Sequence, residues 1–191
     1  FSATELAKQL SGKSAYASLG AGEYEHTVNA GGSPKDIETI LQLVYLNFTA
    51  PRFDETDLQN MKNMYVPYFK NMESDPNYIV GREFSKTMYG DHARRQITSA
   101  AQIEALNIPA LKAIHSKLYG YADDFRFDIV GNVNPETLKP LVEKYLGSLP
   151  TSKKVEYAVV DDGVRFVDGN VVNDFRTPMQ QPKVSVRLVY S

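Results

Sequence analysis

The sequence predicts an α+β fold, on the strength of two kinds of pattern and of their order along the chain. Alternating polar and apolar residues, the spacing of a half-buried strand, occur at 14–29 and again at 125–130. Apolar residues at helical spacing fill most of the remainder up to residue 150. Because the strands and helices do not alternate regularly, the order disfavours a doubly wound parallel sheet.

The first elements are a short helix and a pair of strands. Ser2 and Glu5 form the pattern of a capping box, and Gly12 is a suitable stop for the helix that follows. The segment 14–29 then predicts two strands around the turn 20–22. We expect one half-buried face on the second strand, carrying Tyr24, His26 and Val28.

Two long helices are predicted next. The first starts at Pro34, ends before Pro51 and has one apolar stripe. That stripe consists of Ile37, Ile40, Leu41, Val44 and Phe48. The second helix is capped by Asp54 and contains Pro67, where we expect a kink or an early break because proline cannot donate a helical hydrogen bond.

The remaining elements up to residue 150 are helices around one strand. A helix starts at Asp75-Pro76 and ends at Gly90, and further caps are Ser99, Asn107 and Asn134. Between the last two caps, Phe125, Phe127 and Ile129 alternate with Arg126, Asp128 and Val130, which predicts a strand.

After Pro150 the helical spacing gives way to short β-type runs rich in Asp and Gly, which suggests that the chain has three parts. Residues 1–150 form the main domain, residues 151–182 form a β-rich connector, and residues 183–191 start the next domain. The last part alternates apolar residues like a strand without a visible partner. Both ends are interpreted as cuts within a longer protein.

Composition excludes several classes of function. The chain has no Cys, which removes disulfides, thiolate metal sites and a Cys nucleophile. A net charge of −2 gives no electrostatic case for nucleic acid, and no apolar run is long enough to cross a bilayer.

The histidines do not form a metal-binding motif. His26, His92 and His115 are the three in the chain, and no two stand one helical turn apart. The zinc motif H-E-x-x-H and its inverse H-x-x-E-H both need such a pair, and neither motif occurs in the sequence. We expect His26 at a polar strand position, His92 in a solvated loop and His115 at the polar edge of a helix.

Other candidate chemistry is equally weak. Gly20-Ala21-Gly22 is favoured as a hairpin turn over a phosphate loop, and the pairs Asp123-Asp124 and Asp161-Asp162 as solvated turns. A basic cluster of Lys86, Arg94 and Arg95 is favoured as a charged loop over an anion site. We therefore predict no catalytic, cofactor-binding or metal-binding residue in this chain.

Several ordered segments resemble the C-terminal halves of pitrilysin/insulinase-type zinc metallopeptidases. They are Leu6–Lys13, Gly31–Glu38 with Leu41–Leu46, Phe48–Arg52, Asp124–Val133 and Tyr145–Pro150. The resemblance implies a two-layer fold like that of mitochondrial processing peptidase, with a mixed or antiparallel sheet packed against several helices. It also implies a third-domain segment that lacks its first strands and has lost the zinc ligands.

The resemblance further implies a role for this segment. It would be a non-catalytic domain that helps to form the peptide chamber and scaffolds the zinc-bearing half, with zinc held by the parent and none here. Its partners would be that half, in the same protein or in another subunit, and a peptide substrate. The implied location is the bacterial envelope or periplasm, with the cytoplasm as the alternative. The alternative function is a domain of a non-peptidase binding or assembly protein that shares the fold.

Overall fold

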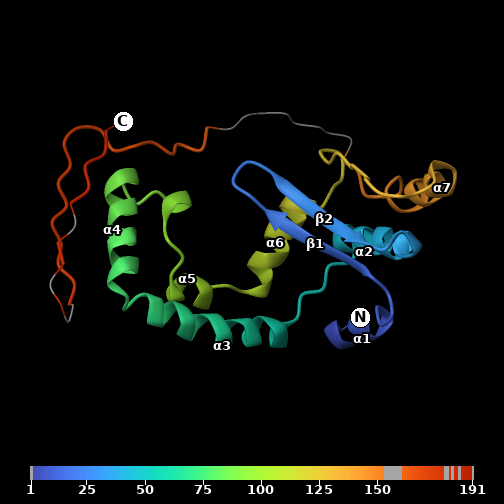
Figure 1. The fold of residues 1–191 in the computed structure, drawn as a ribbon, viewed down its shortest axis with the longest axis horizontal. Helices are drawn as coiled ribbons and strands as arrows, with labels where there is room; N and C mark the ends of the chain where they lie inside the picture. Colours follow the sequence, from blue (N-terminus) through green and yellow to red (C-terminus); the bar gives the residue numbers. More distant parts are fainter. Residues whose placement is uncertain (1, 153–160, 179–180, 182, 185, 191) are drawn as a thin grey trace. The chain divides into compact units, whose positions relative to one another are not determined.

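The fold of the chain is given by a computed structural model, which describes residues 2–152, 161–178, 181, 183–184 and 186–190 (Figure 1). It combines helices with an antiparallel pair of strands, so the predicted α+β class is confirmed. The chain divides into two compact units, which are described separately below. Unit 1 comprises Phe1–Asp54 and Ile108–Tyr157, and unit 2 comprises Glu55–Asn107 and Ala158–Ser191.

Unit 1 opens with helix α1 (Ala3–Gln9), whose start follows the predicted capping box. The backbone N–H of Glu5 donates to Ser2 Oγ at 3.1 Å, and the N–H of Ser2 donates to Glu5 Oε2 at 2.7 Å. Two N–H groups that the first helical turn leaves without partners are thereby satisfied.

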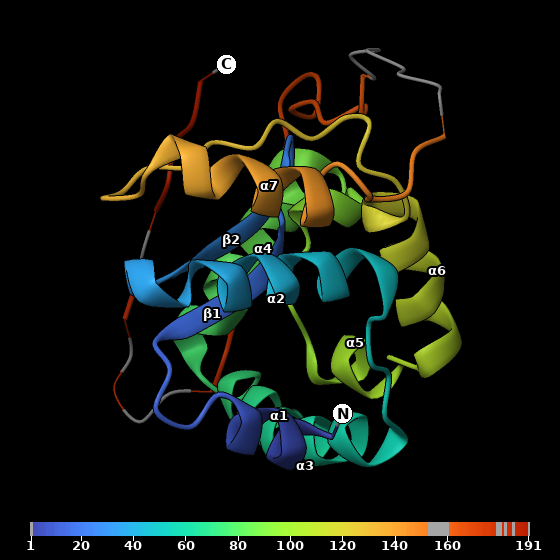
Figure 2. The same cartoon turned by 90° about the vertical axis from the view of Figure 1, so that its right-hand side faces the viewer.

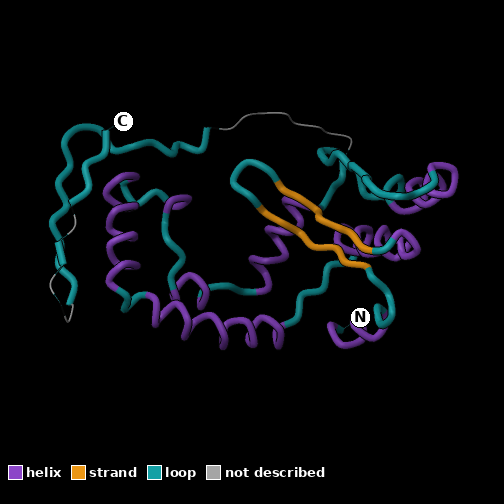
Figure 3. The backbone as a smooth tube through the Cα atoms, in the orientation of Figure 1, coloured by secondary structure: helices purple, strands orange, loops and turns teal. Residues whose placement is uncertain are grey.

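A β-hairpin follows, formed by strands β1 (Ala15–Ala21) and β2 (His26–Gly32), and it confirms the predicted strand pair (Figure 3). In its register Ala15 lies opposite Gly32, and Ala21 opposite His26. The predicted half-buried face holds for Val28 but was wrong for Tyr24, which lies in the turn and is 85% exposed, and for His26, which is exposed at the start of β2. The turn is closed by a hydrogen bond from Gly22 N to the Glu25 carbonyl, so β2 begins only after Tyr24.

The hairpin packs against helix α2 (Ile37–Thr49), which is preceded by a 3₁₀ turn at Pro34–Asp36 (Figure 2). The predicted apolar stripe is confirmed at four of its positions, since Ile40, Leu41, Val44 and Phe48 are buried. Helix α2 ends two residues before Pro51, as its sequence indicated.

The core of unit 1 joins α2 to two later helices, α6 (Ile108–Tyr119) and α7 (Pro135–Tyr145). Its buried members are Val44, Phe48, Tyr119 and Leu149. Partly buried residues of the hairpin and of the loop after α6 pack around this centre, among them Ala17, Leu19, Val28 and Phe125. The predicted cap of α7 is confirmed, because Asn134 Oδ1 accepts from Glu136 N at 2.9 Å.

The predicted strand at 125–130 is not formed. Among the residues that the structure describes, no hairpin partner and no other strand pairs with this segment. A strand exists only as part of a hydrogen-bonded ladder. Alternation alone therefore gave the wrong secondary structure at this position.

Unit 2 contains the long helix α3 (Glu55–Met72), and helix α5 (Ala100–Glu104) contacts it. Helix α3 continues through Pro67, so the expected early break is wrong. The proline removes a donor to the carbonyl of Asn63. Asn63 is exposed, so water can satisfy that carbonyl and the helix can tolerate the loss.

Helix α4 (Pro76–Tyr89) has both of its predicted ends. Asp75 Oδ1 accepts from Asn77 N at 2.7 Å, and Gly90 closes the helix with a φ of 61°. This left-handed conformation suits glycine, which has no Cβ. The hydroxyl of the buried Tyr78 donates to the Thr98 carbonyl at 2.6 Å and ties α4 to the segment before α5.

The described residues after 160 run along α4 without forming a helix or a strand. Phe166 stacks on Tyr89 with ring centroids 5.2 Å apart, and Val167 N donates to the Met88 carbonyl at 3.0 Å. The expected connector at 151–182 falls partly outside the described residues, and the division at 150 and 182 remains a proposal. Among the described residues, no helix is long and apolar enough to span a bilayer.

Candidate functional site

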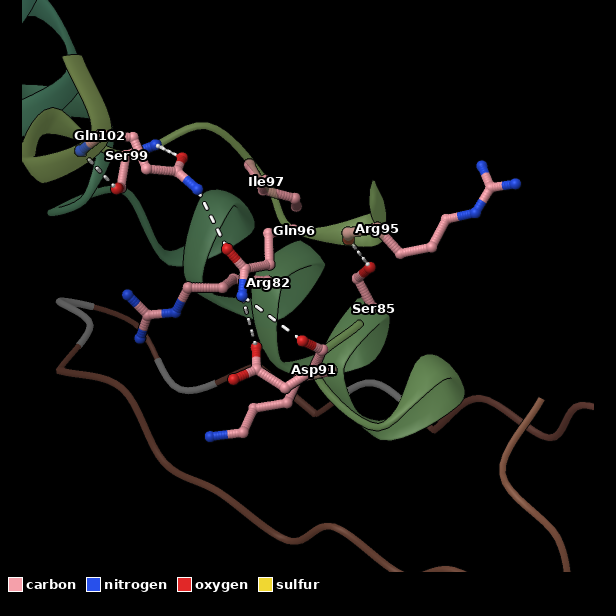
Figure 4. A pocket seen from close by; sticks show the side chains of 9 residues that line it. Arg82, Ser85, Asp91, Arg95, Gln96, Ile97, Ser99 and Gln102 are labelled. Atoms are coloured by element: carbon pink, nitrogen blue, oxygen red, sulfur yellow. Dashed lines mark hydrogen bonds between the residues drawn. The ribbon is translucent and has the colours of Figure 1, made fainter. Parts of the chain in front are cut away.

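The described part of unit 2 has a small surface pocket of about 240 Å³ beside α4 (Figure 4). Its walls come from three places. Arg82, Ser85 and Lys86 lie on α4, the segment Asp91–Ile97 includes the 3₁₀ turn Ala93–Arg95, and Ser99 and Gln102 lie at the start of α5. Of the predicted basic cluster, Lys86 and Arg95 line this pocket, whereas Arg94 is not among the lining residues.

Several polar groups of this pocket form hydrogen bonds with one another. Gln102 Nε2 donates to Gln96 Oε1 at 3.0 Å, and Gln96 Nε2 donates to the Asp91 carbonyl at 3.4 Å. Ser99 N donates to Gln102 Oε1 at 2.9 Å, and Gln102 N donates to Ser99 Oγ at 3.3 Å, which completes a second capping box. The network fixes the connection between α4 and α5 and leaves few groups for a ligand.

The cations of the pocket do not converge on one point. Arg82 binds the neighbouring Glu83 at 3.2 Å, and the guanidinium of Arg95 lies 5.4 Å from the centre of the Tyr89 ring. Figure 4 shows the side chains of Arg82 and Arg95 pointing in opposite directions. An anion would need several donors aimed at the same place, so this geometry favours a structural role.

Arg94, from the predicted basic cluster, forms an ion pair 3.7 Å from Asp162. His92 contributes to the same corner of unit 2. Its Nδ1 accepts from Arg94 N at 3.3 Å, and its Nε2 lies 3.1 Å from the Asp162 carbonyl. This pattern indicates the neutral tautomer with the proton on Nε2. The imidazole thus caps the turn, which is a more specific role than the solvated loop expected.

The other two histidines lie in unit 1 at separate structural positions. His115 Nε2 donates to the Asn47 carbonyl at 2.8 Å and so links α6 to α2. His26 is exposed at the start of β2, with its ring 6.2 Å from that of Tyr119. Within the described ranges, no three of the His, Asp and Glu side chains are grouped to hold a metal. The expectation that this chain has no metal ligands remains a prediction.

The paired aspartates differ in their surroundings. Asp161 behaves as a turn residue, since hydrogen bonds from Gly163 N and from the Arg165 side chain hold the pKa of its carboxyl below the ordinary value. Asp123 does not match the solvated turn expected. Its Oδ2 is part-buried and accepts from Ser152 N at 2.5 Å and from Ser152 Oγ at 3.0 Å. It secures the end of the core segment beyond α7, a contact between distant residues that sequence could not indicate.

Comparison with known proteins gives this arrangement a class. Residues 105–190 match the family described as the peptidase M16 inactive domain. Over 166 residues the chain is 26% identical to the zinc protease PQQL-like protein of Arabidopsis thaliana, which covers 81% of this chain. The match extends over only 17% of the plant protein, so the chain spans about a sixth of that relative.

Solved structures agree on the fold. The periplasmic protease PqqL from Escherichia coli superposes with a TM-score of 0.67 and 20% identity, over 79% of this chain and 17% of its own. A peptidase M16 inactive domain from Pseudomonas fluorescens gives a TM-score of 0.59 and 24% identity, over 79% of this chain and 38% of its own. The predicted resemblance is thereby confirmed. The chain is similar to the inactive, C-terminal domain of M16-type zinc peptidases.

Proposed function

We propose that this chain is a non-catalytic domain of a larger zinc metallopeptidase, in which it scaffolds the zinc-bearing half and helps to enclose the peptide substrate. The observation that carries the proposal is the match of residues 105–190 to a domain described as inactive, within relatives named as proteases. The hydrogen bonds of His92 and His115, and those among the residues of the pocket beside α4, agree with a domain that contributes structure rather than chemistry.

The hairpin of unit 1 supports the enclosing part of the proposal. One of its faces carries Ala17, Leu19 and Val28 into the core, while Tyr16, Ser18 and Asn29 on the other face are exposed. Tyr16 is 58% exposed, and its ring crosses Gly31 so closely that a Cβ there would lie 3.0 Å from the hydroxyl oxygen. A polar face with a fixed aromatic ring is suited to contact an extended peptide.

The remaining parts of the proposal follow from the same relatives. Zinc would be held in the catalytic half, and the partners would be that half and its peptide substrate. We place the protein in the bacterial envelope, in line with the periplasmic protease that shares its fold. The division into a domain at 1–150, a connector at 151–182 and the start of another domain at 183–191 belongs to this proposal.

Reconstitution tests the function directly. This chain, the zinc-bearing half and their mixture would each be assayed for cleavage of an unstructured peptide, with and without a zinc chelator. Zinc content of each sample would be measured in parallel. We expect no cleavage and no retained zinc in the chain alone, and chelator-sensitive cleavage in the mixture that exceeds the activity of the zinc-bearing half.

Cleavage together with tightly held zinc in the chain alone would contradict the proposal. A mixture that assembles but gains no activity would instead favour the alternative, a binding or assembly domain that shares the fold. Tyr16→Ala in the mixture sharpens the test of enclosure: it should weaken peptide binding and raise KM, whereas the exposed turn variant Tyr24→Ala should not.

A further inference from the structure

The segment of unit 2 that runs along α4 contains two Asp-Gly steps in opposite surroundings. They are Asp162-Gly163 and Asp168-Gly169. An aspartate followed by glycine is the step at which a backbone nitrogen most readily attacks the side-chain carboxyl before it, because glycine has no Cβ to crowd the approach. The two steps have the same chemistry, so a difference in their reactivity must come from their contacts.

The first step is restrained at both of its reacting groups. Gly163 N, the attacking atom, donates to Asp161 Oδ1 at 3.0 Å. The Asp162 carboxyl accepts from Val164 N at 3.0 Å and lies 3.7 Å from Arg94 Nη1. Its side chain is only 19% exposed. Attack on this carboxyl therefore requires the hydrogen bond of Gly163 to open and the carboxyl to turn away from its partners.

The second step has neither restraint. Asp168 and Gly169 are both exposed. Among the described residues, neither the carboxyl of the aspartate nor the N–H of the glycine has a hydrogen-bond partner. A Cβ placed on Gly169 would meet no atom within 4 Å, so the space beside the attacking nitrogen is open. The carboxyl and the nitrogen can approach each other without breaking a contact of the fold.

We propose that Asp168-Gly169 is a site of spontaneous isoaspartate formation in the folded chain, whereas Asp162-Gly163 is protected. Gly169 N bonds to Asp168 Cγ, the Cγ–O bond breaks and water leaves, which closes a succinimide ring. Water then adds to the ring. Opening at the backbone carbonyl leaves the chain running through Cγ as isoaspartate, and opening at the other carbonyl restores aspartate. The water lost is regained and nothing is oxidised or reduced, so the backbone gains one atom without a change in mass.

The added backbone atom falls between two contacts that tie this segment to α4. Before the site, Val167 N donates to the Met88 carbonyl at 3.0 Å. After the site, Asn173 Nδ2 donates to Thr87 Oγ1 at 2.8 Å. A longer backbone at residue 168 no longer matches the spacing of these two contacts. Isomerisation therefore loosens the segment from α4, and the N–H of Val167, directly before the site, is the first group affected.

Ageing of the 191-residue chain tests the site. Folded chain and chain held in urea would be incubated side by side at the same mildly acidic pH. Isoaspartate at each step would be measured by chromatographic separation of the isomeric peptides and by methyl transfer from S-adenosylmethionine with a protein isoaspartate methyltransferase. In the folded chain we expect at least about 10-fold more isoaspartate at 168 than at 162, because hydrogen bonds must open first at 162. In urea the two steps should react to similar extents.

The comparison of the two steps decides the outcome. Little isoaspartate at 168 in the folded chain would overturn the proposal. Equal amounts at both steps in the folded chain would also overturn it, because the contacts of Asp162 and Gly163 would then protect nothing. Circular dichroism before and after incubation verifies that the first sample is folded, and the longer protein takes its place if the spectrum matches that in urea.

Two variants separate the reactive step from the protection of the other. Asp168→Glu keeps the charge but needs a larger ring for closure, so the product at this step should vanish; a signal that persisted would assign it to another position and contradict the proposal. Asp161→Ala removes the acceptor of Gly163 N and should raise isoaspartate at 162 severalfold. No rise would show that this hydrogen bond is not the protection.

Hydrogen exchange measures the consequence for α4. The amide of Val167 should exchange faster in the aged chain than in Asp168→Glu aged in the same way, because the bond to the Met88 carbonyl is weakened only where isoaspartate has formed. Equal exchange in the two aged samples would overturn the loosening of the segment.

Discussion

Two segments of unit 1 have the same alternating pattern, yet only one forms a sheet. The hairpin at 15–32 is a regular antiparallel ladder, while 125–130 forms no strand with any of the described residues. Both lie against α2, and both contribute to the core around Phe48. The difference between them is therefore one of hydrogen-bond partners rather than of hydrophobic pattern.

The hairpin provides its own partner through a short turn. Residues 22–25 reverse the chain within four residues, and the bond from Gly22 to Glu25 sets the register that places Ala17, Leu19 and Val28 on the core side. By contrast, 125–130 is followed by a turn into α7, so the chain that follows does not return beside it as a strand. Alternation specifies which side chains face inward, and chain connectivity decides whether a ladder forms.

The largest test of this comparison removes the ring that both segments share. Phe48→Ala should destabilise unit 1 by about 3–5 kcal/mol, because a buried aromatic side chain is replaced by a cavity. Urea unfolding followed by circular dichroism would measure the change. Exchange labelling should show faster exchange in both the hairpin and the 122–125 turn, since each loses the same support.

The matched control is an exposed aromatic residue in the same unit. Tyr24→Ala, in the hairpin turn, should change stability by less than about 0.5 kcal/mol. If Phe48→Ala loosened the hairpin and left the turn before 125–130 unaffected, the shared core would not be what holds that segment in place.

A smaller effect should distinguish the hairpin from the segment 125–130. The hydroxyl of the buried Tyr119 donates to the Gly20 carbonyl at 2.7 Å, and burial raises the pKa of this phenol. Tyr119→Phe keeps the ring and removes the hydrogen bond, so it should cost about 1–2 kcal/mol. Amides of β1 and β2 should exchange faster, whereas the 122–125 turn should be unchanged.

Tyr121→Phe is the matched control, because the Tyr121 side chain is 56% exposed and is not a member of the core cluster of unit 1. It should leave stability unchanged by the same urea assay. A loss of equal size in both variants would show that the bond to Gly20 contributes nothing specific to the hairpin.

Local signals in the sequence were sufficient for most helix ends. The caps at Ser2, Asp75, Ser99 and Asn134 are formed as predicted, because a side chain and an N–H two or three residues away decide each of them. The apolar stripe of α2 was likewise readable, since its spacing is that of one helical face. These features depend on neighbours within a single turn.

Features that depend on distant residues were not readable. A ladder at 125–130 would need a partner from elsewhere in the chain. The bond from Ser152 to Asp123 and the contact of His92 Nε2 with the Asp162 carbonyl both join positions far apart in the sequence. The pocket beside α4 illustrates the same limit, because the clustering of cations was predicted and their divergence was not. The ordered motifs of the sequence were sufficient to predict the family resemblance, and the comparisons confirmed that resemblance.

The smallest effect concerns the contact that places α7 beside α2. Glu38 Oε1 accepts from Tyr145 Oη at 2.7 Å and from Lys144 Nζ at 3.2 Å. These bonds, the Tyr145 bond first, lower the pKa of Glu38 below its ordinary value of 4.5. Bonds to Tyr145 and Glu38 raise the pKa of Lys144 above 10.5.

The signs of these two shifts define a window of pH. A lowered carboxyl pKa means that the contribution of Glu38 is complete above about 4.5 and is lost as pH falls through the folded value. A raised amine pKa means that the contribution of Lys144 is complete below about 10.5 and is lost as pH rises through its folded value. The contact is therefore fully formed at neutral pH, and because both groups are exposed its effect should be modest.

Glu38→Gln should accordingly lower the urea midpoint near pH 7 by a small amount, and the difference from the unmodified chain should shrink as pH falls below 4.5 and through the lowered pKa of Glu38. Glu143→Gln is the control on the same helix, because its carboxylate lies 4.0 Å from Lys139 in an exposed pair within α7. It should produce little change at either pH. A difference for Glu38→Gln that persisted at low pH would mean that the shape of the side chain, and not its charge, holds α7 against α2, as the apolar core holds the hairpin.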